Sequence, residues 1–258
     1  MKIWEAAQGA RVFDLAQPYF VGMPHHPSHP PYLFGLTKQH GDMLTPAGHS
    51  SAADAIAMGS HVGTHIDGFG HFSCGGTLHG GVPVDGNQSY QAGLSVHTAA
   101  GITPLVRRGV LLDFAQAGPL AEDVEITPAM LEARGVEIRE GDVVLLRTGW
   151  GRYWRDARRY INAVSGAVTG PGPGLAGAKW LSERKPVAVG SDTVAFEKVP
   201  AADMPVHVHL LFEKGIHLIE ALQLEELAEA GVKEFLFVGA PLKLEGATGA
   251  PMRPLAIL

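Results

Sequence analysis

Short apolar runs alternate with helical patterns in the second half of the chain. The run 143–148 is continuously apolar before Arg147 and is rich in β-branched residues, which predicts a buried strand. A helix is predicted before it, because Thr127 can cap the first turn, Pro128 suits the first helical position and Gly135 can end the helix. Together with an apolar strand at 110–113, these segments predict a strand, helix, strand unit.

The same alternation continues toward the C-terminus. It predicts helices at 175–183, 210–214 and 224–230, and strands at 187–192, 216–219 and 235–238. Such alternation is typical of an α/β architecture with at least partly parallel strand pairing. The run Gly-Pro-Gly-Pro-Gly at 170–174 favours a rigid turn over a phosphate loop, because its prolines lack backbone N–H donors.

The first fifty residues differ from the rest, because proline and histidine are frequent there. Proline disfavours both helices and central strands, so we expect an extended arm packed on one catalytic domain that spans 1–258. His25, His26 and His29 are interpreted as loop residues, because proline flanks them without the fixed spacing of a ligand set.

Composition and charge exclude several classes of partner. The 258 residues are 46% hydrophobic and 18% charged, which is enough apolar material for a substantial core. A formal net charge of −6 argues against nucleic acid and anionic membranes as partners. No apolar run approaches the ~18 residues of a membrane span, and no signal-peptide pattern opens the chain, so we expect a cytoplasmic protein.

Cysteine chemistry contributes little. Cys74 is the single cysteine, so neither an internal disulfide nor a zinc-ribbon site is expected. The chain has 13 histidines, and any transition metal must therefore bind imidazole and carboxylate groups.

The densest set of such groups lies in the segment 61–72. A period of two puts His61, His65, Asp67 and His71 on one side of this segment and the apolar residues on the other. A straight strand would separate His61 from Asp67 by roughly 20 Å, so the segment must bend, and glycines within it permit this. His61, His65 and Asp67 then form a three-ligand metal site with open positions, which is typical of catalytic sites.

A second candidate cluster lies about 150 residues further along the chain. His207 opens a predicted helix, and Glu220 ends the strand that follows, so both can converge at one end of the sheet. His209 and His217 are close by in sequence and are interpreted as packed or solvated residues, although whether His207 or His209 is the ligand stays open.

These residues suggest a mechanism. A divalent ion on His61, His65 and Asp67 would make bound water acidic and polarise a substrate carbonyl. His71 can then accept the proton of that water and return it to a leaving nitrogen. Cys74 is not favoured as a nucleophile, since no neighbouring cation in the sequence would lower its pKa.

At these residues the sequence resembles the metal-dependent cyclase family, which includes bacterial kynurenine formamidases, isatin hydrolase and polyketide-type cyclases. The family motif His-x-Gly-Thr-His-x-Asp-x-Pro-x-His stands at 61–71, with Phe69 in the proline position. The likeness extends to the segments 13–15, 147–150, 171–174, 190–193, 207–220 and 246–251.

The resemblance implies a swivelling β/β/α fold with a mixed sheet and a homodimer or homotetramer whose subunits complete each other's sites. It implies that His61, His65 and Asp67 hold a first metal ion, with His71 close to the reacting water. His207 and Glu220 match further ligands of some members, so one or two ions are implied. Phe69 leaves this ligand set intact but alters the wall of the pocket.

The resemblance implies hydrolysis of a carbon–nitrogen bond, so the expected function is hydrolysis of a small amide by metal-activated water. The resemblance favours an aryl formamide such as N-formylkynurenine or a cyclic amide or imide as the substrate, and the ligand set suits zinc or manganese. A cyclase or dehydratase that uses the same Lewis acid is the alternative enzyme class, together with a lactone hydrolase. A metal-binding protein without turnover is the third alternative, because a fold does not determine a function.

Overall fold

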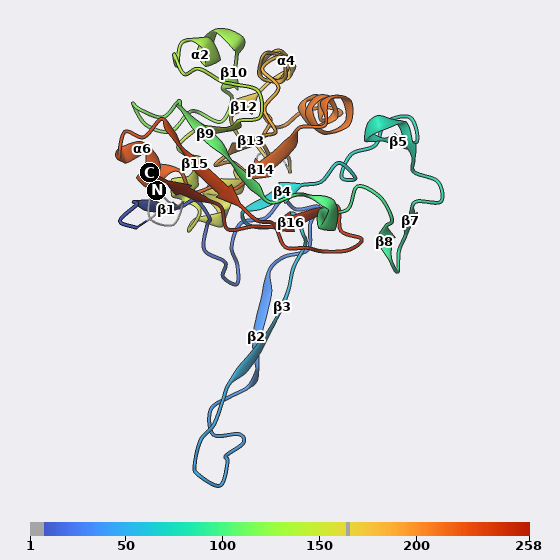
Figure 1. The fold of residues 1–258 in the computed structure, drawn as a ribbon, viewed down its shortest axis with the longest axis vertical. Helices are drawn as coiled ribbons and strands as arrows, with labels where there is room; N and C mark the ends of the chain where they lie inside the picture. Colours follow the sequence, from blue (N-terminus) through green and yellow to red (C-terminus); the bar gives the residue numbers. More distant parts are fainter. Residues whose placement is uncertain (1–7, 164–165) are drawn as a thin grey trace.

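A large mixed β-sheet organises the molecule (Figure 1). The computed structural model describes residues 8–163 and 166–258, and within these ranges the sheet has nine strands. Their order across the sheet is β1 (Val12–Asp14), β17 (Leu255–Ile257), β15 (Glu234–Gly239), β9 (Leu105–Asp113), β11 (Val143–Arg147), β13 (Ala188–Ser191), β14 (His217–Glu220), β4 (His65–Asp67) and β16 (Gly249–Pro251). The strands β9, β11, β13 and β14 pair in parallel, and the pairings outside this block are antiparallel.

The central strands are apolar throughout because both of their faces are covered. Val143 and Leu145 of β11 belong to one buried cluster, and Val144 and Leu146 belong to another on the opposite face. The first cluster packs against α6 (Glu225–Glu229), and the second packs against α2 (Pro128–Glu132) and α4 (Leu175–Ser182). Strands buried on both faces therefore appear in the sequence as continuous apolar runs without alternation.

The predicted α/β fold with a mixed sheet is confirmed, and the predicted elements lie close to their expected positions. Thr127 caps α2, where its hydroxyl accepts the Met130 N–H at 3.4 Å, and Gly135 follows that helix with a φ of 63°. The helix expected at 210–214 begins earlier, as α5 (Pro205–His207), and continues as a π-helical segment over Val208–Lys214. Such wide turns are frequent at functional sites.

Shorter elements connect these parts. The 3-10 helices are His79–Gly81, Ala99–Gly101 and Trp150–Tyr153, and α3 spans Ala157–Ile161. Residues Gly172–Pro173 of the glycine and proline run form β12, which pairs with β10 (Glu125–Ile126), and Gly174 opens α4. Two small hairpins join β5 (Thr77–Leu78) to β6 (Val82–Pro83) and β7 (Gln88–Ser89) to β8 (Gly93–Leu94).

The proline-rich N-terminal segment has three parts. Its first seven residues lie outside the described ranges, and β1 adds an edge strand to the main sheet. The strands β2 (Leu33–Lys38) and β3 (Ala53–Ala57) pair as a long hairpin that extends away from the sheet (Figure 1). Both faces of this hairpin are exposed along nearly its whole length in the described part of the chain.

Within the described ranges, no helix is long and apolar enough to cross a membrane.

Candidate metal centre

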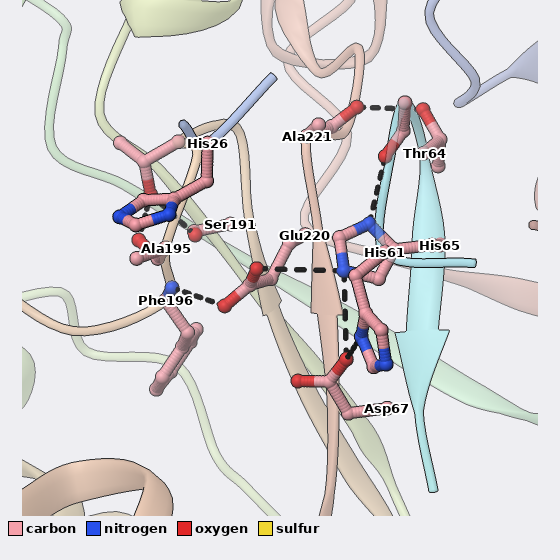
Figure 2. Close-up of polar contacts among 12 residues, drawn as sticks. His26, His61, Thr64, His65, Asp67, Ser191, Ala195, Phe196, Glu220 and Ala221 are labelled. Carbon is pink, nitrogen blue, oxygen red and sulfur yellow. Dashed lines mark hydrogen bonds and ion pairs between the residues drawn. The ribbon is translucent and has the colours of Figure 1, made fainter. Parts of the chain in front are cut away.

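Two paired strands position three of the candidate ligands. β4 carries His65 and Asp67, whose side chains share one face because they are two residues apart, while Ile66 between them lies in the core. β14 pairs with β4 in antiparallel register and places Glu220 opposite His65. Figure 2 shows that Glu220 and Asp67 both face the same nitrogen of His65, Nε2.

The chain bends sharply before β4, as the spacing required. Gly63 has a φ of 72°, and a Cβ at this position would lie 2.3 Å from the Tyr19 ring. The bend brings the His61 and His65 rings to a centroid separation of 5.3 Å, and His61 Nδ1 lies 2.6 Å from Asp67 Oδ1. The other ring nitrogen of His61, Nε2, lies 2.7 Å from Thr248 Oγ1, so the two nitrogens face different partners.

The second sequence cluster reaches the same place. His207 Nε2 lies 3.3 Å from Glu220 Oε1 and 3.9 Å from Asp67 Oδ2, and Glu220 Oε2 lies 3.5 Å from His65 Nε2. Of the two histidines of this cluster, only His207 faces these carboxylates. His209 points elsewhere, with its ring nitrogens 2.9 Å from Ser182 and 2.6 Å from Glu213.

The chemistry of this donor set fits a divalent cation. His65 Nε2 and Asp67 Oδ2 are buried and have no hydrogen-bond partner in the structure, which is costly unless something absent from the chain satisfies them. Two groups of three ligand atoms lie within 4.8 Å of one another, namely His61, Asp67 and His71, and His65, Asp67 and Glu220. Asp67 belongs to both groups, so its carboxylate is the donor that the two groups share.

Electrostatics among the buried groups favour ionised Asp67. Burial alone would raise the pKa of Asp67, but the charges of the surrounding imidazoles and the hydrogen bond with His61 hold the pKa well below its usual range. Burial lowers the pKa of His71 to about 3, although Asp67 acts in the opposite direction. The His71 ring is therefore neutral at pH 7 and has a nitrogen lone pair that can accept a proton.

His71 and Phe72 lie beside the candidate ligands. The His71 ring stacks on His61 with centroids 3.9 Å apart, and Phe72 lies 5.0 Å from both His71 and His207. Phe69, in the position where the family motif has proline, faces away from this cluster and stacks on His217 at 4.1 Å. Cys74 is exposed and has no place in the centre.

The sequence interpretation missed Glu197. This carboxylate is almost completely buried, and its Oε1 lies 2.5 Å from His207 Nδ1 and accepts the His207 backbone N–H at 3.1 Å. It thereby directs Nε2 of His207 toward Asp67 and Glu220, an arrangement typical of histidines that bind metals. A single acidic residue inside the apolar stretch 194–199 was a weak signal of burial, which the adjacent Lys198 obscured.

Two histidines of the N-terminal segment also reach the centre, against the expectation that they are plain loop residues. The His29 ring stacks on His61 at 5.2 Å, and burial lowers its pKa to about 4. His26 lies close enough to Glu220 for that charge to favour its protonated form, although burial lowers its pKa overall (Figure 2). The sequence did not reveal that His26 and His29 lie at the centre, because a proline-rich segment predicts a loop but not the part of the fold that this loop covers.

The protonation of His207 predicts pH-dependent metal binding. Burial lowers the pKa of His207, but its hydrogen bonds to Glu197 and Glu220 outweigh burial and raise the pKa to about 10. A cation can bind Nε2 only after that proton leaves, so we expect metal affinity to rise roughly tenfold per pH unit from about pH 6 to pH 9. Competition with a chromophoric chelator across this range measures the slope.

Replacing Glu197 with Gln should make the rise of metal affinity with pH shallower. Glu197 and Glu220 both raise the pKa of His207, and the substitution removes the charge of Glu197. We also expect affinity at pH 9 to fall roughly 10-fold to 100-fold, since His207 loses the partner that orients it. Glu213→Gln removes the equivalent partner of His209, which lies outside the centre, and should change neither quantity. An unchanged slope in Glu197→Gln would show that Glu197 does not control His207.

Comparison with known proteins shows that this chain is similar to cyclases and to two kinds of amide hydrolase. The family model described as "Putative cyclase" matches residues 13–198. An isatin hydrolase from Roseibium aggregatum is 26% identical over 210 residues, covering 79% of this chain and 73% of that protein. A kynurenine formamidase from Bordetella petrii is 24% identical over 249 residues, covering 95% of this chain and 97% of that protein. A crystal structure described as a novel cyclase superposes with a TM-score of 0.87 at 28% identity, covering 99% of this chain and 89% of that chain.

Proposed function

The chain belongs to the cyclase family, and from this premise we propose that it is a divalent-metal-dependent hydrolase of small amides. The observation that carries the proposal is the buried set of imidazoles and carboxylates around Asp67, in which His65 Nε2 and Asp67 Oδ2 lack partners. The names of the two similar proteins, an isatin hydrolase and a kynurenine formamidase, support an amide substrate.

The residues that would hold the metal are His61, His65, Asp67, His207 and Glu220. A bound zinc or manganese ion supplies Lewis acidity, which polarises a substrate carbonyl and makes water nucleophilic near neutral pH. Glu220 and Asp67 provide the negative charge that a divalent cation needs, and Glu197 keeps Nε2 of His207 directed at them.

His71 is the group suited to proton transfer. Its neutral ring accepts a proton as water adds to the carbonyl carbon, and returns that proton to the nitrogen as the carbon–nitrogen bond breaks. The products are a carboxylic acid and an amine. Phe72 lies beside His71 and His207 and offers an apolar ring for a flat aromatic substrate, so we propose an aryl formamide or a cyclic aryl amide.

Hydrolysis of N-formylkynurenine, isatin and simple lactones by the zinc-loaded and manganese-loaded protein tests this function. We expect amide turnover that chelation abolishes and one of the two metals restores. Lactone turnover alone, or ring closure and water loss without amide hydrolysis, would favour the lactone hydrolase or the cyclase. Tight metal binding without any turnover would contradict the proposal.

We also propose that the protein is a homo-oligomer in which a second copy covers the β2–β3 hairpin. A two-stranded hairpin is marginally stable alone, and this one exposes large apolar side chains with only three charged residues in the segment 33–57. These side chains are Leu33, Phe34, Leu36, Met43, Leu44 and Ile56. A twofold pair of hairpins would bury them symmetrically.

The double variant Phe34→Glu and Ile56→Glu tests this interface. We expect light scattering to show a dimer or tetramer for the native chain at micromolar concentration and a monomer for the variant, because paired carboxylates would be buried without partners. Val106→Glu changes an exposed apolar residue on the body and should leave the assembly intact. A native chain that is monomeric at about 100 μM would contradict the proposal.

A further inference from the structure

A second cluster of imidazoles lines a cavity outside the metal centre. The cavity has a volume of about 580 Å³, and its wall includes His79, His97, His217 and the ring of Phe69. Phe69 lies parallel to His217 at 4.1 Å and 5.0 Å from His79, so the aromatic ring is surrounded by imidazoles. None of these three histidines belongs to the ligand set around Asp67.

Backbone carbonyls determine how each of these rings is oriented. His79 Nδ1 lies 2.7 Å from the carbonyl of Phe212, His217 Nδ1 lies 2.7 Å from that of Asp67, and His97 Nε2 lies 3.0 Å from that of His79. A carbonyl only accepts, so each of these ring nitrogens donates its N–H. The opposite nitrogen of each neutral ring is therefore a hydrogen-bond acceptor, and none of the three has a partner among the described residues.

These acceptors do not form a preformed metal site. In the described part of the chain, the groups whose ligand atoms lie within 4.8 Å of one another are the two that contain Asp67. The cavity therefore suits a ligand that donates hydrogen bonds rather than a cation that requires short, convergent coordination.

The charge of the wall adds a second requirement for the ligand. Arg107 lines the cavity and is exposed, while no carboxylate lines it. Within the described ranges the neighbouring acidic residues Asp142 and Glu234 pair with Arg108, and Arg107 forms no ion pair. An unpaired guanidinium beside a cavity without acidic residues attracts a carboxylate, which it can bind through two hydrogen bonds. Ile102, Leu105 and Val187 supply apolar wall for the body of such a ligand.

We propose that this cavity binds a small aromatic amino-carboxylate. Its carboxylate pairs with Arg107, its amine N–H groups donate to the free imidazole nitrogens, and its ring packs beside Phe69 and the aliphatic wall. The source of the ligand rests on the proposed function, because hydrolysis of a cyclic aryl amide leaves an amine and a carboxylate on one molecule. The binding itself does not depend on that function.

The fluorescence anisotropy of 2-aminobenzoate, titrated with the metal-loaded protein, tests the proposal. We expect saturable binding that weakens roughly tenfold or more in Arg107→Gln, because a charge-assisted pair is lost. Arg158→Gln removes an exposed arginine of α3 outside the cavity wall and should bind normally. Benzoate lacks the amine and aniline lacks the carboxylate, so each should compete at least roughly tenfold more weakly than 2-aminobenzoate.

Chelated protein and the Glu220→Gln variant distinguish this cavity from the metal centre. We expect both to bind 2-aminobenzoate with unchanged affinity, whether or not they hydrolyse any amide. Loss of binding on chelation, together with normal binding by Arg107→Gln, would place the probe at the metal and overturn the proposal. Absence of saturable binding at millimolar protein would also overturn it, whereas absence of turnover would affect only the proposed function.

Discussion

Asp67→Asn should lose both bound metal and turnover, the largest effect expected from any single substitution in this chain. Asp67 belongs to both groups of candidate ligand atoms and lies 2.6 Å from His61 and 3.4 Å from His65. The amide keeps the size of the side chain but removes the charge that a divalent cation needs. We expect kcat/KM to fall at least ~10³-fold, because the several kcal/mol that a bound metal contributes is lost.

Metal content and activity of the same preparation measure this effect. We expect Asp67→Asn to retain less than about 0.2 ion per chain after reconstitution, while Glu220→Gln, which keeps the candidate ligands His61, His65 and Asp67, retains one ion. Asp123→Asn changes an exposed carboxylate outside both the centre and the β2–β3 hairpin, so it is the matched control and should behave as the native protein. Native metal content in Asp67→Asn would show that Asp67 is not the shared ligand.

His71→Ala should keep the metal and lose turnover. His71 lies beside the ligands, stacked on His61 at 3.9 Å, but five other candidate ligands remain when its ring is removed. Burial lowers the pKa of His71, so its ring is neutral at pH 7. We expect kcat to fall about 10²-fold to 10⁴-fold, the usual size for loss of a general base.

Metal content decides between the two roles that the position of His71 allows. It shares one ligand group with His61 and Asp67, so a loss of metal in step with activity would make His71 a ligand and contradict its role in proton transfer. His40→Ala removes an exposed histidine from the hairpin segment and should change neither metal content nor kcat.

Local sequence patterns were sufficient for the elements of the fold and for the first ligand set. The apolar run of β11, the cap of α2 and the glycine that follows α2 depend on neighbouring residues, so they can be recognised without knowing the rest of the chain. The candidate ligands His61, His65 and Asp67 lie within seven consecutive positions, and the glycine between them signalled the bend.

The tertiary structure decided how distant segments meet. Pairing of β14 with β4 places Glu220 opposite His65, and the helical turn at His207 directs that ring inward while His209 faces Ser182. A one-residue shift in the pairing of β14 with β4 would turn a different side chain toward the centre, and no local pattern specifies this pairing.

The residues that the sequence interpretation missed have the same physical explanation. Glu197 acts through His207, ten positions away, and His29 contacts His61 across a proline-rich loop whose course depends on the whole domain. Phe69 could be recognised as a departure from the motif, but its stacking on His217 depends on a strand formed 150 residues later. Sequence alone therefore determined the main elements and the first cluster of candidate ligands. Strand pairing and loop packing decided which further side chains surround it, because those contacts join segments that are far apart along the chain.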